Sequence, residues 1–155
     1  MKNKNLNQEI SKAKAHYVDV LGVVPEPIRA MAQYAPEALL AYQEFKKYLY
    51  KPPAEAALDL KVKELIYVVL DTATGNLAGA NNHLKAAIDQ GLTQDELAEA
   101  MIQVMNVCGI TTWGQTGYKV LDEAHRLLAK KKTKKNTAVK KLRQTAKITK
   151  KLNKS

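Results

Sequence analysis

Apolar residues recur along this chain at intervals of three and four, and the strict alternation of a half-buried strand is nearly absent. Such spacing places apolar side chains on one face of an α-helix. Glycine and proline interrupt the pattern at short intervals, as at Gly22, Pro36, Pro53 and Gly75. The chain has 155 residues, which is enough for one domain with its own core. The sequence therefore predicts an all-α fold, built as a single compact multi-helix domain.

The interruptions divide the chain into six or seven expected helices. They cover about residues 7–21, 27–34, 36–50, 60–74, 80–90 and 94–108, and a last helix begins at about residue 112. Asp59 is placed to cap the fourth helix. Thr93, with Glu96 three residues later, has the pattern of a capping box at the start of the sixth. The segment 60–70 is apolar almost all round, which predicts a helix that is buried on every side.

The formal net charge of +10 is a property of the C-terminal part of the chain. Residues 1–125 carry 12 Lys or Arg and all 15 acidic residues, whereas residues 126–155 carry 13 Lys or Arg and no acid. We therefore expect an all-α domain over residues 1–129 and a Lys-rich tail over residues 130–155, either an extended helix or disordered. The tail has no aromatic residue for base stacking, so any contact with a polyanion would be non-specific. A solvated tail that only aids solubility is an equally good interpretation.

Cysteine usage and hydropathy exclude several classes of protein. The only cysteine is Cys108, so one chain cannot form a disulfide, a Cys-x-x-Cys redox pair or a thiolate-rich metal site. No apolar run approaches the roughly 20 residues of a transmembrane helix, and the first residues lack the apolar core of a secretory signal. These features favour a cytoplasmic protein without a transmembrane segment, and we expect no metal or other cofactor.

Two residues in the apolar helices point to chemistry. Glu64 lies in the middle of the apolar segment, where a carboxylate is costly unless it is hydrogen-bonded or paired. His83 falls on or beside the buried face of the next helix. Glu64 is 11 residues before Gly75 and His83 is 8 after it, so an antiparallel hairpin places them at similar depth, offset by roughly one turn. The two side chains can then hydrogen-bond as a satisfied core pair, or jointly handle a proton.

The other reactive side chains are expected to be less important. His16 and His125 lie among charged residues, which indicates solvated faces and no role. Cys108 follows an apolar stripe, which favours a buried, inert thiol. Trp113 can wall a pocket at a helix junction, although core packing is the commoner use of such a residue. Arg29 is the only arginine before Arg126, so the expected core offers no arginine to clamp a carboxylate.

Three segments carry a resemblance to a known family. Residues 58–66 read LDLKVKELI, His83 follows Glu64 by nineteen residues, and residues 91–97 read GLTQDEL. Their order and spacing resemble the carboxymuconolactone decarboxylase family, which shares its fold with alkylhydroperoxidase D. The resemblance covers about residues 30–125 and implies an alkylhydroperoxidase D-like fold. It also implies a homo-oligomer, commonly a trimer or hexamer, in which neighbouring subunits help to wall the site.

The resemblance separates two branches of chemistry. In the redox branch of the family a Cys-x-x-Cys pair lies between the Glu and the His, and here those two positions are Asn76 and Gly79. Without two thiols the peroxidase cycle has no chemistry to run, so residual peroxidase-type activity is the less favoured implication. The decarboxylase branch keeps the His and lacks the cysteine pair, and Glu64 and His83 match its positions.

The resemblance to the decarboxylase branch implies an enzyme that acts on a small organic acid or lactone by proton transfer. His83 would donate or shuttle the proton, and Glu64 would orient it. The candidate substrate-binding residues are Tyr67, Asn76, Asn82 and Trp113. The alternative is a non-catalytic oligomeric binding protein whose basic tail contacts a polyanion. A basic amphipathic helix on an anionic membrane surface is a third interpretation of the tail, supported by a thin apolar stripe.

Overall fold

The computed structural model describes residues 2–133 and residue 137, and these residues form helices and connecting loops without any strand. The helices are α1 (Lys2–Leu21), α2 (Glu26–Tyr34), α3 (Pro36–Leu49), α4 (Leu60–Ala73), α5 (Leu77–Asp89), α6 (Gln94–Cys108) and α7 (Ile110–Thr112). A π-helical turn, η1 (Trp113–Gly117), continues α7 into a helix over residues 118–133. The all-α prediction is confirmed. Within the described residues, no helix has the length and hydropathy needed to cross a membrane.

The helix ends follow from side-chain caps and glycines. Asp59 accepts a hydrogen bond from the backbone N–H of Val62 at 2.8 Å, which satisfies an otherwise unpaired donor at the start of α4. Thr93 and Glu96 form both hydrogen bonds of the predicted capping box. Between α4 and α5, Gly75 adopts a φ of 77°, a left-handed conformation that other residues rarely take. The chain can therefore reverse there and pack α5 antiparallel to α4.

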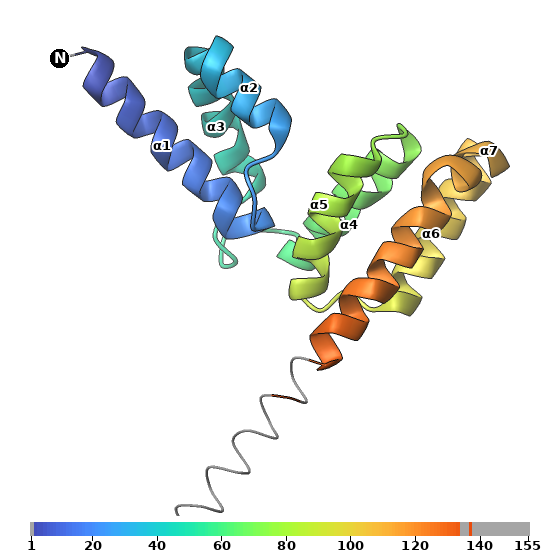
Figure 1. Ribbon diagram of the computed structural model, residues 1–155. Coiled ribbons are helices and arrows are strands. Elements are labelled where there is room, and N and C mark those ends of the chain that lie inside the picture. The colour runs from blue at the N-terminus through green and yellow to red at the C-terminus, as the bar shows by residue number, and fades with distance from the viewer. Residues whose placement is uncertain (1, 134–136, 138–155) are drawn as a thin grey trace, which may run out of the picture.

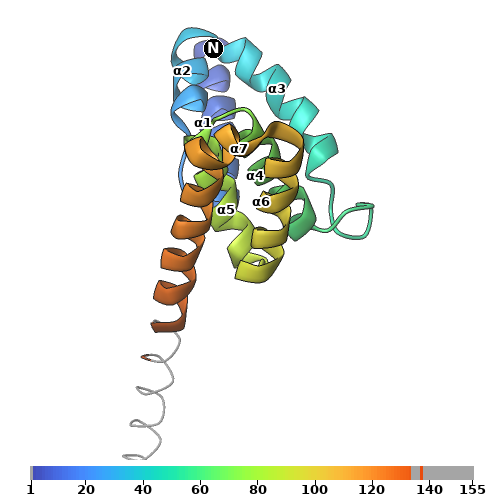
Figure 2. The ribbon, with the colours of Figure 1, turned by 90° about the vertical axis from the view of Figure 1, so that its right-hand side faces the viewer.

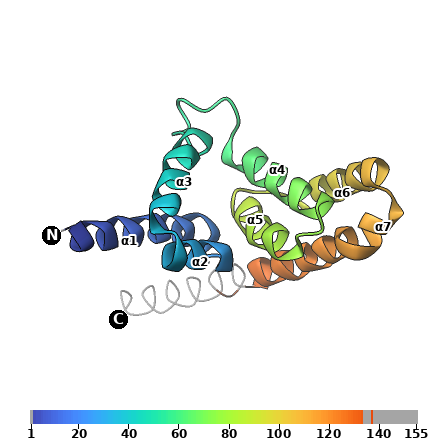
Figure 3. The same cartoon turned by 90° about the horizontal axis from the view of Figure 1, so that it is seen from above.

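The helices form two groups that meet at α5 (Figure 1). Helices α1, α2 and α3 form one group, in which α3 crosses α1, and residues 50–59 lead across to α4 (Figure 3). Its apolar cluster includes Tyr17, Leu39 and, from α5, Ala86. The neighbouring Ala87 faces the second cluster, which joins α4, α5, α6 and the helix over residues 118–133. Because α5 contributes to both clusters, it holds the two groups together.

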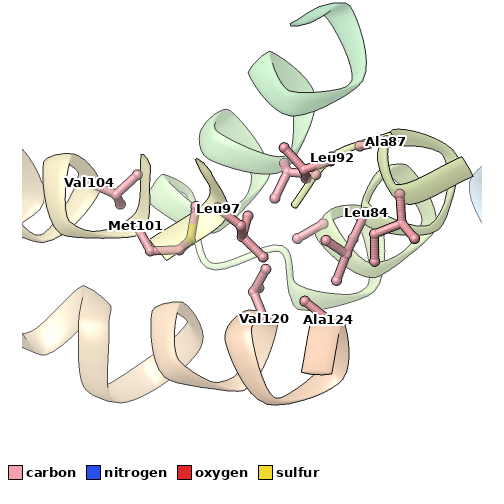
Figure 4. Packing of buried hydrophobic residues seen from close by; sticks show 11 residues of the cluster. Leu84, Ala87, Leu92, Leu97, Met101, Val104, Val120 and Ala124 are labelled. Atoms are coloured by element: carbon pink, nitrogen blue, oxygen red, sulfur yellow. The ribbon is translucent and has the colours of Figure 1, made fainter. Parts of the chain in front are cut away.

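The second cluster is the larger core of the described chain. Leu97 and Met101 of α6 are fully buried against Val120 of the helix over residues 118–133, and Leu84 of α5 completes the contact (Figure 4). Leu97 and Met101 are one turn apart on α6, so both face the same neighbour. This packing fixes one side of α5, and its other side packs against α1.

Two expectations about burial are wrong. The segment 60–70 is not buried all round, because Ile66 is 42% exposed and Leu70 is 57% exposed. One side of α4 covers the core, and these two side chains lie on the side that no other element of the described chain covers. Cys108 is exposed rather than buried. It lies at the end of α6, where neither α7 nor η1 encloses it, next to the 82%-exposed Val107.

The first residues of the expected tail belong to a helix. The helix over residues 118–133 runs past position 130 and extends beyond the other helices (Figure 2). The Lys131 ammonium donates to the carbonyl of Ile88 at 2.9 Å and lies 3.2 Å from the Asp89 carboxylate. A cation at the C-terminus of a helix is favourable, so Lys131 attaches this helix to the end of α5. Residues 134–136 and 138–155, and with them most of the expected tail and its polyanion contact, lie outside the described residues.

Glu96 makes the fold sensitive to acid. The hydrogen bond from Lys61, at 2.7 Å, and those from Thr93 lower the pKa of Glu96 from 4.5 to about 2. Because the pKa is lower in the folded state, this contribution to stability is present above about pH 4.5 and is lost as the pH falls towards 2. The substitution Glu96→Gln keeps an acceptor for the capping box. We expect the free energy of unfolding of this variant to fall less steeply than that of the wild type as the pH decreases over that range.

Urea unfolding between pH 7 and pH 2.5 measures the effect. The matched control is Glu99→Gln, on the exposed side of the same helix, whose carboxylate forms no ion pair within the described chain. Equal acid dependence of the wild type and Glu96→Gln would show that the Lys61–Glu96 pair contributes nothing.

Candidate functional site

The centre of the candidate site is the carboxylate of Glu64, which is fully buried. One oxygen, Oε2, lies 2.7 Å from Nδ1 of His83, and the other, Oε1, accepts a hydrogen bond from the Tyr50 hydroxyl at 2.8 Å. The contact that helix geometry predicts between Glu64 and His83 is therefore confirmed. Both oxygens have a partner, as a buried carboxylate requires.

The α4–α5 hairpin positions Glu64 and His83. Glu64 is one turn before Tyr67 on α4, and the Tyr67 ring stacks on the His83 imidazole with centroids 4.4 Å apart and planes 14° apart. The ring of Tyr50, at the C-terminal end of α3, is stacked in turn on Tyr67 at 6.4 Å. This stack and the hydrogen bond to Glu64 leave the imidazole little freedom to rotate. Within the described residues, His83 Nε2 has no hydrogen-bond partner, and the side chain is 13% exposed.

A buried lysine lies beside this stack. Lys46 of α3 is 6% exposed, and its ammonium lies 4.9 Å from the ring centroid of Tyr50 and 5.5 Å from that of Tyr67. The rings of Tyr17 and Tyr42 are 5.1 and 5.8 Å away. Within the described residues the ammonium makes no hydrogen bond and no ion pair, so aromatic faces supply its immediate stabilisation.

Burial controls the protonation of these groups. It lowers the pKa of Lys46, and the Glu64 charge opposes that change. It raises the pKa of Tyr50, with the charge of Glu64 acting in the same direction, and it raises the pKa of Tyr17 to about 12. The phenols therefore keep their protons at neutral pH, and Tyr50 serves as a hydrogen-bond donor to Glu64.

The expectation that His16 lies on a solvated face is wrong. The imidazole is half-buried and packs edge-on against Tyr50, with centroids 5.5 Å apart, and against Tyr17 at 5.7 Å. Burial, and next the charge of Lys46, lower the pKa of His16, so it is neutral at physiological pH. Lys12, one turn earlier on the same side of α1, is exposed, so a charged neighbour in sequence did not indicate the burial of His16.

Two hollows reach the site. The larger, of about 690 Å³, lies between α1 and α3, and its lining includes His16, Lys46 and Tyr50. The smaller, of about 480 Å³, is mainly apolar and is bounded by Tyr50, Tyr67 and the exposed side of α4. Glu64 and His83 line neither hollow. Tyr50 borders both hollows and contacts Glu64, so it connects the carboxylate with each of them.

The predicted substrate-binding residues are distributed unevenly. Tyr67 lies in the site, and Asn82 is half-buried on α5 beside His83 without a side-chain hydrogen bond in the described part of the chain. Asn76 is exposed and caps α5, accepting from Gly79 N–H at 3.1 Å and donating to Asp71 at 2.9 Å. Trp113, in η1, is packed against the larger core. The structure therefore joins Tyr67 to the Glu64–His83 pair and gives Asn76 and Trp113 structural contacts elsewhere.

Sequence reasoning missed Lys46 and Tyr50, although one signal was present. Leu39, Gln43, Lys46 and Tyr50 are separated by four, three and four residues, which places them on one face of a helix. Leu39 is fully buried, so that face is the inner one. A lysine on it is unusual, since lysine is almost never buried without a partner.

Metal binding finds no support in the described residues. They contain no group of three or more His, Cys, Asp or Glu side chains placed to hold an ion. Glu64 and His83 are two such ligands, and the other groups around them are phenols and an ammonium. Protonated phenols and a cation are poor partners for a metal ion, so this site is suited to proton transfer and anion binding.

Comparisons with known proteins identify one family. The model of the carboxymuconolactone decarboxylase family matches residues 36–123, a segment that contains Lys46, Tyr50, Glu64, Tyr67 and His83. The chain belongs to the carboxymuconolactone decarboxylase family. A crystal structure from Burkholderia xenovorans LB400, of a protein provisionally named a carboxymuconolactone decarboxylase, superposes with a TM-score of 0.78 at 35% identity. The match covers 83% of this chain and 98% of that one. No protein of curated function matches the chain.

Asn76 and Gly79 form the hydrogen-bonded start of α5. A Cβ atom on Gly79 would lie too close to the side chains of Asn76 and Asp71. Asn76 itself is engaged by Asp71 and by the Gly79 N–H. A hydrogen-bonded helix start therefore occupies the place where the redox branch of the family carries its cysteines.

Proposed function

We propose that this chain is a cytoplasmic enzyme that decarboxylates a small organic acid or lactone by proton transfer at Glu64 and His83. The observation that carries the proposal is the 2.7 Å contact between His83 Nδ1 and the fully buried Glu64 carboxylate. A carboxylate that holds one ring nitrogen orients the imidazole and stabilises its charged form, while the other nitrogen remains available to a substrate. Membership of the carboxymuconolactone decarboxylase family supports the same reaction class.

The proposed reaction replaces a carboxylate by a proton. The bond between the carboxylate and its carbon breaks, CO2 leaves, and the electron pair stays on carbon, delocalised into the unsaturated system of the acid. His83, protonated on both ring nitrogens, transfers the Nε2 proton to that carbon and keeps its Nδ1 proton, which it donates in a hydrogen bond to Glu64 Oε2. Water then returns a proton to Nε2. Tyr50, by donating to Glu64 Oε1, holds the carboxylate in position throughout.

Thiol chemistry has no support in this chain. Cys108 is its only cysteine, and it lies exposed at the end of α6 rather than beside Glu64 and His83. A peroxidase cycle of this type needs one thiolate to attack and a second thiol to resolve the sulfenic acid. Cys108→Ser is therefore expected to leave the rate of decarboxylation unchanged.

The test is turnover of a panel of small unsaturated lactone carboxylates by the full chain in D2O. The expected result is one CO2 released per product, with one solvent-derived deuterium at the carbon that lost the carboxylate. Peroxide consumption with a thiol reductant is measured in parallel and is expected to be at background. Absence of CO2 release across the panel, or CO2 release without deuterium at that carbon, would refute the proposal.

We also propose that the protein forms a homo-oligomer, as the resemblance to the family implies. The exposed apolar side chains of α4, Ile66 and Leu70, support this, since they border two hollows on the same side of the helix. Apolar surface of this kind is covered when a second copy packs on it. Light scattering after size-exclusion chromatography is expected to give the mass of a trimer or hexamer, and Leu70→Glu is expected to lower it. A monomeric mass for the wild type would contradict this proposal.

A further inference from the structure

Lys46 has a position that the proposed proton transfer does not explain. The residue is 6% exposed, and within the described residues its ammonium has no hydrogen-bond acceptor and no carboxylate within 4 Å, although the charge of Glu64 acts on it at longer range. Burying a charge costs free energy that is recovered only when the group is paired and hydrogen-bonded. Four tyrosine rings offset part of that cost, yet a ring face cannot accept the three N–H bonds of an ammonium as an oxygen does.

The ammonium also borders open space. Lys46 lines the hollow of about 690 Å³ between α1 and α3, together with His16 and Tyr50. Lys12 and Lys47 lie on the same lining, and Lys47 is already paired with Glu44 at 2.6 Å. The hollow is therefore large enough for a small organic molecule. Glu9 also lines it and offsets the charge of Lys12, so the excess positive charge of the lining is that of Lys46, next to Tyr50.

We propose that Lys46 is the anion-binding residue of this hollow, and that it holds a carboxylate group of a small unsaturated or aromatic acid. The ammonium supplies the charge and three donors, and the oxygens of the ligand supply the acceptors that the protein lacks. The ring of Tyr50 and the half-buried His16, which both line the hollow, offer flat surfaces for the rest of the molecule. This preference for flat apolar surface favours an organic carboxylate over a compact inorganic anion.

The position of Lys46 relative to Glu64 indicates which carboxylate group of a substrate Lys46 would bind. Tyr50 contacts both the hollow and Glu64, so an acid on Lys46 lies beside the residue that holds the proton-transfer pair. A direct bond from Lys46 to the carboxylate that leaves as CO2 would stabilise the substrate more than the transition state and slow its loss. Lys46 therefore binds a group that remains on the molecule. This identification of the ligand as substrate rests on the proposed function, whereas the anion site does not.

The test is binding, measured without turnover. Benzoate, sorbate and adipate are titrated into the full chain, beside the uncharged amides benzamide and sorbamide, with isothermal calorimetry and lysine NMR signals as readouts. We expect at least one carboxylate to bind, and its amide to bind roughly 30-fold more weakly or worse, because an ammonium gains little from a neutral oxygen. In Lys46→Met the carboxylate is expected to lose affinity by a similar factor.

The matched control is Lys51→Met. Lys51 is also a lysine over a tyrosine, 4.0 Å from the Tyr48 centroid, but it lines the smaller, mainly apolar hollow and not the one that Lys46 lines. The variant removes the same charge. Carboxylate affinity is expected to be unchanged in this variant. Equal losses in both variants, equal affinity of acid and amide, or no binding by any of the three acids would each overturn the proposal. The acid–amide comparison uses the wild type alone, so it decides even if Lys46→Met fails to fold.

The outcomes also separate this inference from the proposed function. Lys46-dependent carboxylate binding without CO2 release from any lactone acid would support the anion site and refute the decarboxylase. The opposite result has two parts: Lys46→Met releases CO2 with unchanged kcat and KM, and the acids and amides bind equally well. It would support the decarboxylase and refute the anion site.

Discussion

His83→Ala is expected to lower kcat for decarboxylation by about 10²- to 10⁴-fold, the usual contribution of a positioned general acid or base. The substitution removes Nε2, the proposed donor to carbon, and leaves the Glu64 carboxylate with Tyr50 as its hydrogen-bond partner. Steady-state kinetics on a lactone acid, with the rate of CO2 release as the readout, measures the effect. Because Lys46 binds the ligand in the proposed site, KM should change far less than kcat.

The matched control is His125→Ala. His125 is an exposed histidine on the helix over residues 118–133, away from the site. Its substitution by alanine removes the same imidazole ring. Its kcat should equal that of the wild type, and circular dichroism melts of both variants report whether each is folded. A folded His83→Ala protein with wild-type kcat would exclude His83 as the proton donor.

Glu64→Gln distinguishes orientation from proton donation. The amide keeps the shape of the side chain and can still accept from Tyr50, but it no longer carries the charge that stabilises a protonated His83. We therefore expect a loss of kcat in the same direction as for His83→Ala, and the double variant should lose little more than His83→Ala alone. Additive losses would show that the two residues act independently.

Leu97→Ala is expected to lower the free energy of unfolding by about 2–5 kcal/mol. Leu97 is fully buried in the larger core, beside Met101 and facing Val120 (Figure 4). Truncation removes apolar contacts and leaves a cavity between α6 and the helix over residues 118–133, which cannot move closer without disturbing α5. Urea unfolding at pH 7 gives the change.

Ile102→Ala is the control on the same helix. Ile102 is 47% exposed on the other side of α6, so its truncation leaves no cavity. We expect a change in unfolding free energy within about 0.5 kcal/mol, as for surface substitutions in general. If Leu97→Ala and Ile102→Ala lowered the free energy of unfolding by similar amounts, α6 would not bury Leu97 and expose Ile102.

The contact between Glu64 and His83 was predictable because it depends on local geometry. Two consecutive helices joined by Gly75 must run antiparallel, and the rise per residue then sets which positions face each other. The same holds for the capping box at Thr93 and Glu96, whose partners are three residues apart. In each case the chain between the partners is short, so few arrangements are possible.

Lys46, Tyr50 and His16 were not predictable in the same way. Tyr50 reaches Glu64 from the end of α3, and His16 of α1 and Lys46 of α3 lie beside Tyr50. Only tertiary packing brings those helices to α4. A helical stripe can indicate that Lys46 faces inward, but it cannot indicate what it faces. The exposure of Cys108 and Leu70 was missed for a related reason, since an apolar pattern does not say whether a neighbour covers it.

The sequence by itself determined the helices, their ends, the all-α class and the pairing of Glu64 with His83, because these follow from periodicity, caps and short-range geometry. Only the tertiary structure decided that Tyr50 contacts that pair, and that the ammonium of Lys46 and the ring of His16 lie beside Tyr50. The physical reason is that such contacts depend on how two separate groups of helices dock. That docking results from the shapes of whole apolar surfaces, to which α5 contributes on both sides.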